Sequence, residues 1–114
     1  MLAKKFRLSG PKDFKRVENE GKIYQSVSFG LACFDRKDED PSRFGFIVST
    51  KISKDSSDRN RFKRTLSEVV RTSMTDIKNG FDAVFLVKPT ITRVATADVM
   101  KEVKAALKGS GLTK

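Results

Sequence analysis

Histidine is absent from this 114-residue sequence, so the commonest general base and the commonest protein metal ligand are both missing. The sequence also contains no Cys-x-x-Cys pair and no glycine-rich phosphate loop ending in Gly-Lys-Ser/Thr. Its carboxylates form no spaced pair that stands out as an acid and a base. Catalysis by the polypeptide alone is therefore disfavoured, and we assign no catalytic residue, no metal ligand and no small-molecule substrate.

Cysteine and long apolar runs are also scarce. Cys33 is the only cysteine and lies in an apolar, strand-like run, which predicts a core thiol and excludes an intrachain disulfide. No apolar run approaches the roughly 18 residues of a membrane span. Residues 1–6 lack the apolar centre of a signal peptide. We therefore expect a cytoplasmic protein with no membrane partner.

Acidic residues are outnumbered, 14 against 24 lysines and arginines, which gives a formal charge of +10. The excess is uneven, because residues 1–22 and residues 50–71 each carry seven basic against three acidic side chains. A field of this sign attracts nucleic acid or an anionic surface. Two basic segments can form one binding face if the fold brings them together.

Periodicity and turn residues predict a single α+β domain over residues 1–114, an α/β sandwich in the order helix, strands, helix, strand, helix. The strand at 43–50 is expected to pair back on the strand at 27–34 as a hairpin, and residues 35–42 form a charged, solvated loop rather than a metal site. The apolar run 81–87 suggests a strand covered on both faces. The predicted segments are a basic tail at 1–8, helices at 11–20, 57–75 and 96–108, strands at 27–34, 43–50 and 81–87, and a tail at 109–114.

The helix at 57–75 combines a core side with a basic side. Ser56 or Ser57 is its expected cap, and Thr96 is the expected cap of the last helix. At about 100° per residue the apolar positions fall together, and they are Phe62, Leu66, Val69 and Val70. The polar positions on a neighbouring side are Asn60, Lys63, Arg64, Ser67 and Arg71, with Arg61 on a third. The planar guanidinium groups of arginine bind phosphates and stack on bases, so this helix is predicted to bind RNA.

Phe14, in the predicted helix at 11–20, can serve as a stacking platform for a base or as a core residue, and periodicity favours the core.

The run Arg59-Asn60-Arg61-Phe62-Lys63-Arg64 resembles the Arg-Asn-Arg-x-Lys-Arg signature of the bacterial ribonuclease P protein component. The flanking order agrees: residues 13–17 with Gly21 resemble the family's first helix, and residues 43–51 its strand before the basic helix. Residues 81–87 and the last amphipathic helix complete the likeness, which covers nearly the whole chain.

This resemblance implies the protein subunit of an endoribonuclease that removes the 5′ leader from precursor tRNA, with Mg²⁺-dependent hydrolysis performed by the RNA subunit. The implied fold is the ribosomal-protein-like α/β sandwich with a left-handed βαβ crossover. The implied partners are ribonuclease P RNA and precursor tRNA. By position, Arg59, Asn60, Arg61, Lys63 and Arg64 would contact the catalytic RNA. Phe14 and Lys51 would line the leader cleft, which reverses the assignment of Phe14 to the core.

The chain departs from the family pattern at several positions. Glu18 and Ala32 replace aromatic residues, and Ser53 replaces a glycine. Ser67 stands where the family has an arginine, and residues 55–58 are polar where the family is apolar. Two other classes of function stay open from composition: a structural RNA-binding protein of ribosomal type, and an autonomous nuclease, which the missing histidine disfavours.

Overall fold

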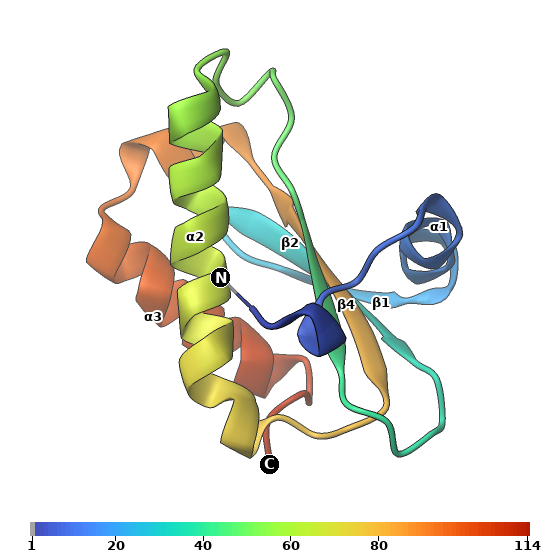
Figure 1. Cartoon of the computed structure of the whole chain (residues 1–114). Helices are drawn as coiled ribbons and strands as arrows, with labels where there is room; N and C mark the ends of the chain where they lie inside the picture. Colours follow the sequence, from blue (N-terminus) through green and yellow to red (C-terminus); the bar gives the residue numbers. More distant parts are fainter. Residues whose placement is uncertain (1) are drawn as a thin grey trace.

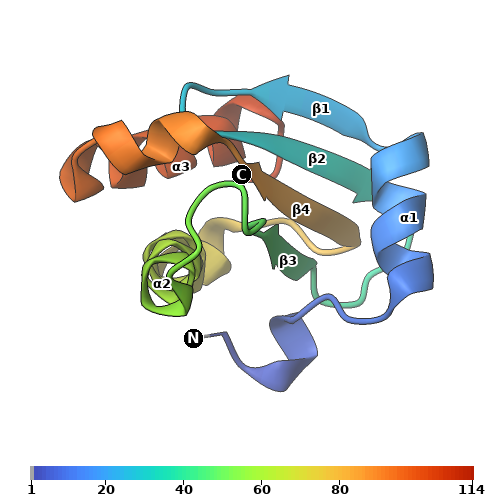
Figure 2. The same ribbon diagram turned by 90° about the horizontal axis from the view of Figure 1, so that it is seen from above.

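The computed structural model describes residues 2–114 as a four-stranded sheet with helices on both faces (Figures 1 and 2). Helix α1 covers one face of the sheet, and helices α2 and α3 cover the other. The predicted α+β class is confirmed. The elements in chain order are η1 (Lys4–Phe6), α1 (Pro11–Glu20), β1 (Lys22–Gln25), β2 (Phe29–Asp35), β3 (Arg43–Ile47), α2 (Ser56–Ser73), η2 (Met74–Asp76), β4 (Phe81–Val87), η3 (Pro89–Arg93) and α3 (Thr96–Gly109).

The strand order β1-β2-β4-β3 corrects the predicted hairpin between the strands at 27–34 and 43–50. Strand β4 lies between β2 and β3, antiparallel to β2 and parallel to β3, and α2 forms the crossover from β3 to β4. The antiparallel partner of β2 is β1, a four-residue edge strand that the sequence analysis missed. Because β4 is apolar on both faces, it is buried most effectively at the centre of the sheet.

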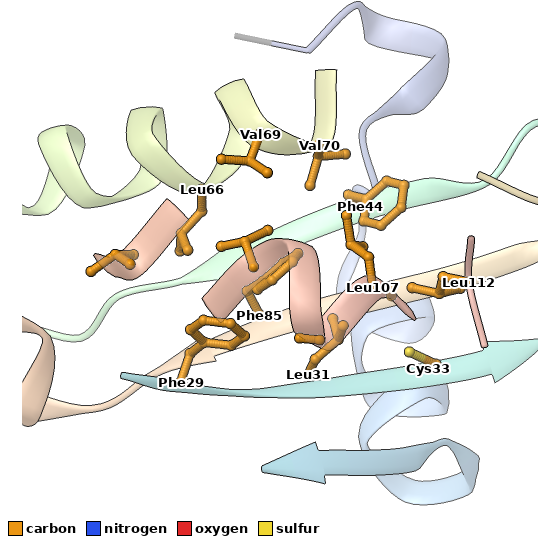
Figure 3. Packing of buried hydrophobic residues seen from close by; sticks show 14 of the residues in the cluster. Phe29, Leu31, Cys33, Phe44, Leu66, Val69, Val70, Phe85, Leu107 and Leu112 are labelled. Atoms are coloured by element: carbon orange, nitrogen blue, oxygen red, sulfur yellow. The ribbon is translucent and has the colours of Figure 1, made fainter. Parts of the chain in front are cut away.

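The main core lies between the sheet and the pair α2 and α3 (Figure 3). Phe85 of β4 is its centre, with ring centroids 5.2 Å from Phe29 and 5.4 Å from Phe46. The predicted apolar sides of both helices point into this core and are buried: Phe62, Leu66, Val69 and Val70 of α2, and Val99, Val103, Ala106 and Leu107 of α3. Cys33 also lies here, and burial raises the pKa of its thiol to about 11, as expected of a core thiol.

The helix starts differ from the predictions. Asp55, rather than Ser56 or Ser57, caps α2, because its carboxylate accepts a 2.8 Å hydrogen bond from the Ser57 amide. A carboxylate there also complements the helix dipole, which a hydroxyl does not. Thr96 is the first residue of α3 and caps nothing, since the cap position is Ala95.

Both chain ends, predicted as tails, pack on the body of the protein over the part that the structure describes; residue 1 lies outside it. Leu2 and Leu8 are buried, and the Leu8 amide donates to the Phe44 carbonyl at 2.9 Å, so residues 2–8 cover the β3 edge of the sheet. At the other end Leu112 is fully buried, and the Lys114 amide donates to the Asp76 carbonyl at 2.8 Å. The apolar side chains within each chain end, Leu2 and Leu8 at one and Leu112 at the other, explain the packing.

Candidate RNA-binding interface

The basic side chains of α2 surround the first two turns of the helix. Phe62 is 7% exposed and anchors this stretch in the core, so its neighbours along the chain face outward. Asn60, Arg61 and Arg64 are exposed, and Lys63 is half-buried. The Arg61 side chain is 64% exposed, with its guanidinium 5.1 Å from the Phe62 ring centroid and 3.8 Å from the Asp58 carboxylate. A weak pair of this kind leaves Arg61 free to exchange its partner for a phosphate.

Arg59 and Ser67 differ from this arrangement. The Arg59 guanidinium donates to the Ser53 carbonyl at 2.8 Å, which ties the start of α2 to the loop before it. Ser67 was predicted on the polar side but is 1% exposed, and its hydroxyl donates to the Arg64 carbonyl. The polar side of α2 is therefore narrower than the helical projection predicts.

Phe14 lies on α1, across the sheet from the signature, whereas Lys51 lies on the α2 side, next to Ile52, which packs against the main core. Phe14 is half-buried on α1, packed against the small cluster of Leu8, Val17, Ala32 and Val84, and its ring covers Gly45 of β3. A Cβ on Gly45 would lie 2.5 Å from that ring, so the glycine is what allows the approach. Lys51 is exposed in the loop between β3 and α2. The ring thus serves as core on one side and remains accessible on the other.

The sheet face beside Phe14 is partly open. Ile47 and Leu86 face one another in the β3–β4 register and are only partly buried. Glu18, one turn after Phe14, is exposed, whereas Ala32 is fully buried under α1. Of these two replacements of aromatic residues, only Glu18 can therefore contact a ligand directly.

A buried carboxylate that the sequence analysis missed fixes α1 on this face. Asp82 of β4 is fully buried and accepts hydrogen bonds from Arg16 at 3.1 Å, Arg36 at 2.6 Å, and Arg43 at 2.9 and 2.8 Å. Burial raises the pKa of Asp82, but the hydrogen bond from Arg43 and the charges of Arg36 and Arg43 outweigh it and hold the pKa below its ordinary value. One acidic residue inside the apolar run 81–87 is the signal that could have found it.

A second carboxylate, Glu102 of α3, fixes the turn between β1 and β2. It accepts hydrogen bonds from the hydroxyls of Ser26 and Ser28, both at 2.6 Å, and from the Ser28 amide at 2.9 Å. Burial raises the pKa of Glu102, but these hydrogen bonds prevail and lower it. The Lys88 ammonium donates to the Ser26 carbonyl at 2.7 Å, so the same turn orients a lysine at this end of the sheet.

The carboxylates of Asp35 and Asp38, in the acidic loop 35–42, accept hydrogen bonds from other residues of the same loop. Both carboxylate oxygens of Asp38 accept hydrogen bonds from Arg36 at 3.0 Å, and Asp35 accepts one from the Lys37 amide at 2.8 Å. Within residues 2–114 no group of three or more acidic or cysteine side chains is placed to hold a metal ion. No helix in the same range is long and apolar enough to cross a membrane.

Comparison with known proteins identifies the family. A family model described as Ribonuclease P matches residues 2–110. The chain belongs to the ribonuclease P protein family. The ribonuclease P protein component of Synechocystis sp. is 38% identical over 77% of this chain and 71% of its own, and that of Cyanothece sp. is 30% identical over 94% and 93%.

Solved structures of the ribonuclease P family share the fold. The RNase P protein of Thermotoga maritima has a TM-score of 0.78 and 29% identity, covering 90% of this chain and 96% of its own. The RNase P protein of Staphylococcus aureus has a TM-score of 0.88 at 21% identity, covering 96% and 98%. As a ribonuclease P protein component, the chain is the protein subunit of an endoribonuclease holoenzyme, works with ribonuclease P RNA in a ribonucleoprotein, and takes part in tRNA 5′ processing.

Proposed function

We propose that α2 is the contact to the catalytic RNA, through Arg59, Asn60, Arg61, Lys63 and Arg64. The observation that carries this assignment is the burial of Phe62 inside the signature, because it turns the flanking cations outward on a helix fixed in the core. The guanidinium groups can donate paired hydrogen bonds to phosphate oxygens, and the Asn60 amide can donate to and accept from a ribose or a base edge. The affinity for the RNA subunit would then come mainly from the phosphates that these cations neutralise.

The 5′ leader of precursor tRNA is assigned to the α1 face of the sheet beside Phe14, with Lys51, in the loop before α2, as a second contact. The half-buried Phe14 ring supports this placement, because a base can stack on its accessible side while its other side stays packed. Ile47 and Leu86 supply an apolar floor. Glu18 brings a negative charge next to the ring and weakens leader binding in this chain.

Hydrolysis is assigned to the RNA subunit with Mg²⁺, in the cytoplasm. The donor set of this chain does not fit a resident Mg²⁺ ion, which prefers several oxygen ligands in an octahedron. The buried or half-buried carboxylates of Asp82 and Glu102 bind arginines and serines instead. The chain's own role is therefore to bind and orient RNA.

The deciding experiment is precursor tRNA cleavage at low Mg²⁺ by a bacterial ribonuclease P RNA, with and without this protein. Stimulated cleavage at the mature 5′ end supports the proposal, and binding to that RNA should weaken in Arg59→Ala and Arg61→Ala, with a flatter dependence on salt. Lys12→Ala, on α1 across the sheet, is the matched control and should leave the affinity for the RNA subunit unchanged. Undiminished affinity in both arginine variants would refute the assignment of α2 as the contact to the catalytic RNA.

A further inference from the structure

Three lysines form a row along the outer side of α3. Lys101, Lys104 and Lys108 are spaced three and four residues apart, which places them on one side of a helix. They lie opposite the buried stripe that begins at Val99, and all three are exposed. Over residues 2–114, none of the three makes an ion pair with a carboxylate. Their charges are therefore available to a partner.

Two of these lysines lie next to α2. The two helices pack against each other and cross, so that α2 is seen end-on in Figure 2 where α3 lies across the view. Beside the signature, Arg61 and Thr65 of α2 line a hollow together with Thr96 of α3. Further along α2, Thr72 and the acid Asp76 line a second hollow of about 500 Å³ together with Lys104 and Lys108. Two separate hollows between the helices, one beside the signature and one beside the lysines, thus lie along the contact of α2 with α3.

The two hollows offer cations and hydroxyls, with Asp76 as the one acidic side chain in their linings, and this set of groups suits a sugar–phosphate backbone. Hydroxyls can donate to phosphate oxygens and pair with ribose 2′-hydroxyls, and lysines neutralise the phosphates. The nearby acid Glu68 is paired with Arg71 on α2. An apolar protein partner would leave both the lysines and the hydroxyls unused, whereas a sugar–phosphate backbone uses both kinds of group.

We propose that the RNA subunit contacts α3 as well as α2, crossing from one helix to the other so that Lys101, Lys104 and Lys108 neutralise phosphates of the same RNA. This inference rests on the proposed function of α2 and extends it. The leader stays on the other face of the sheet, so the α3 row acts on affinity for the RNA subunit and leaves leader recognition alone.

The test compares two triple variants in binding to the ribonuclease P RNA of Synechocystis sp., with the unchanged protein as reference. Lys101→Gln/Lys104→Gln/Lys108→Gln should weaken binding by about tenfold or more and reduce the slope of log affinity against log salt by about 2. The control, Lys12→Gln/Lys15→Gln/Lys22→Gln, removes the same charge from exposed positions in and next to α1, across the sheet. It should change the slope by less than about 0.5.

A second measurement needs no variant. Acetylation of the unchanged protein, with and without the RNA, should show protection of the three α3 lysines and none of Lys12 or Lys15. Equal slopes for the two triple variants, or equal acetylation of the α3 lysines with and without RNA, would overturn the inference. If Arg61→Ala still weakens binding in that case, the proposed function of α2 stands and only its extension to α3 fails.

Discussion

Replacing Asp82 by asparagine tests whether the buried arginine cluster holds α1 on the sheet. The carboxylate is fully buried and accepts four hydrogen bonds from three guanidinium groups. Asparagine keeps the size of the side chain but turns one acceptor into a donor and removes the charge. Arg43 then loses its bidentate partner, and Arg16 loses its link from α1 to β4.

The expected loss is about 3 kcal/mol of unfolding free energy, the lower end of the cost of breaking a buried ion pair. The lower end applies because the side chains of Arg16 and Arg43 are 39% and 30% exposed and can be rehydrated. Urea unfolding at pH 7, monitored by circular dichroism, measures this loss of unfolding free energy. Asp13→Asn is the matched control, since Asp13 is 30% exposed and contacts the same arginines at 3.3 and 3.7 Å; its cost should stay below about 1 kcal/mol.

The difference in stability between the unchanged protein and Asp82→Asn should also depend on pH. Because the folded-state pKa of Asp82 is lowered, its stabilising contribution is fully present above the unfolded pKa of about 3.9 and is lost as pH falls through the folded value. The gap between the unchanged protein and Asp82→Asn should therefore close below about pH 4. A loss under about 1 kcal/mol at pH 7, or a gap that persists unchanged into strong acid, would refute this reasoning.

Three further outcomes are expected. Glu18→Phe should tighten binding of precursor tRNA by the holoenzyme, because it replaces a charge beside Phe14 by a stacking ring; unchanged affinity would count against the placement of the leader. Asp55→Ala should cost about 1 kcal/mol in urea unfolding through loss of the α2 cap, with Ser56→Ala nearly neutral as its control. Glu102→Gln should lower stability at pH 7 and reduce its loss in acid, because the hydrogen-bonded carboxylate has a lowered pKa; acid titrations that superimpose would contradict this.

The sequence was informative wherever a signal is local. The bounds of α1 and β4 were predicted within a residue, and Phe62, Leu66, Val69 and Val70 fall where a 3.6-residue period places them. The signature residues lie on the predicted helix, and three of them, Asn60, Arg61 and Arg64, are exposed. Their role in binding RNA remains a prediction.

What could not be predicted depends on contacts between distant segments. The pairing of β3 with β4 joins residues separated by the whole of α2, and nothing in the 43–50 run distinguishes that partner from the nearer one. Strand β1 is short and mostly exposed, so it has no apolar pattern to detect. The partners of Asp82 come from α1, the acidic loop and β3, and a lone acid in an apolar run predicts a partner without naming it.

The fold also changes what the net charge means. Arg16, Arg36 and Arg43 count toward the basic excess, yet they surround the carboxylates of Asp82 and its neighbours beneath and beside α1. The other cations are spread over both faces: α2 and α3 carry exposed arginines and lysines, and Lys12 and Lys15 are exposed on α1 across the sheet. The cations around Asp82 therefore stabilise the fold, and only the remaining ones add to the field that attracts RNA. This division explains how one 114-residue chain can use part of its basic excess to fix α1 on the sheet and still keep a positively charged surface.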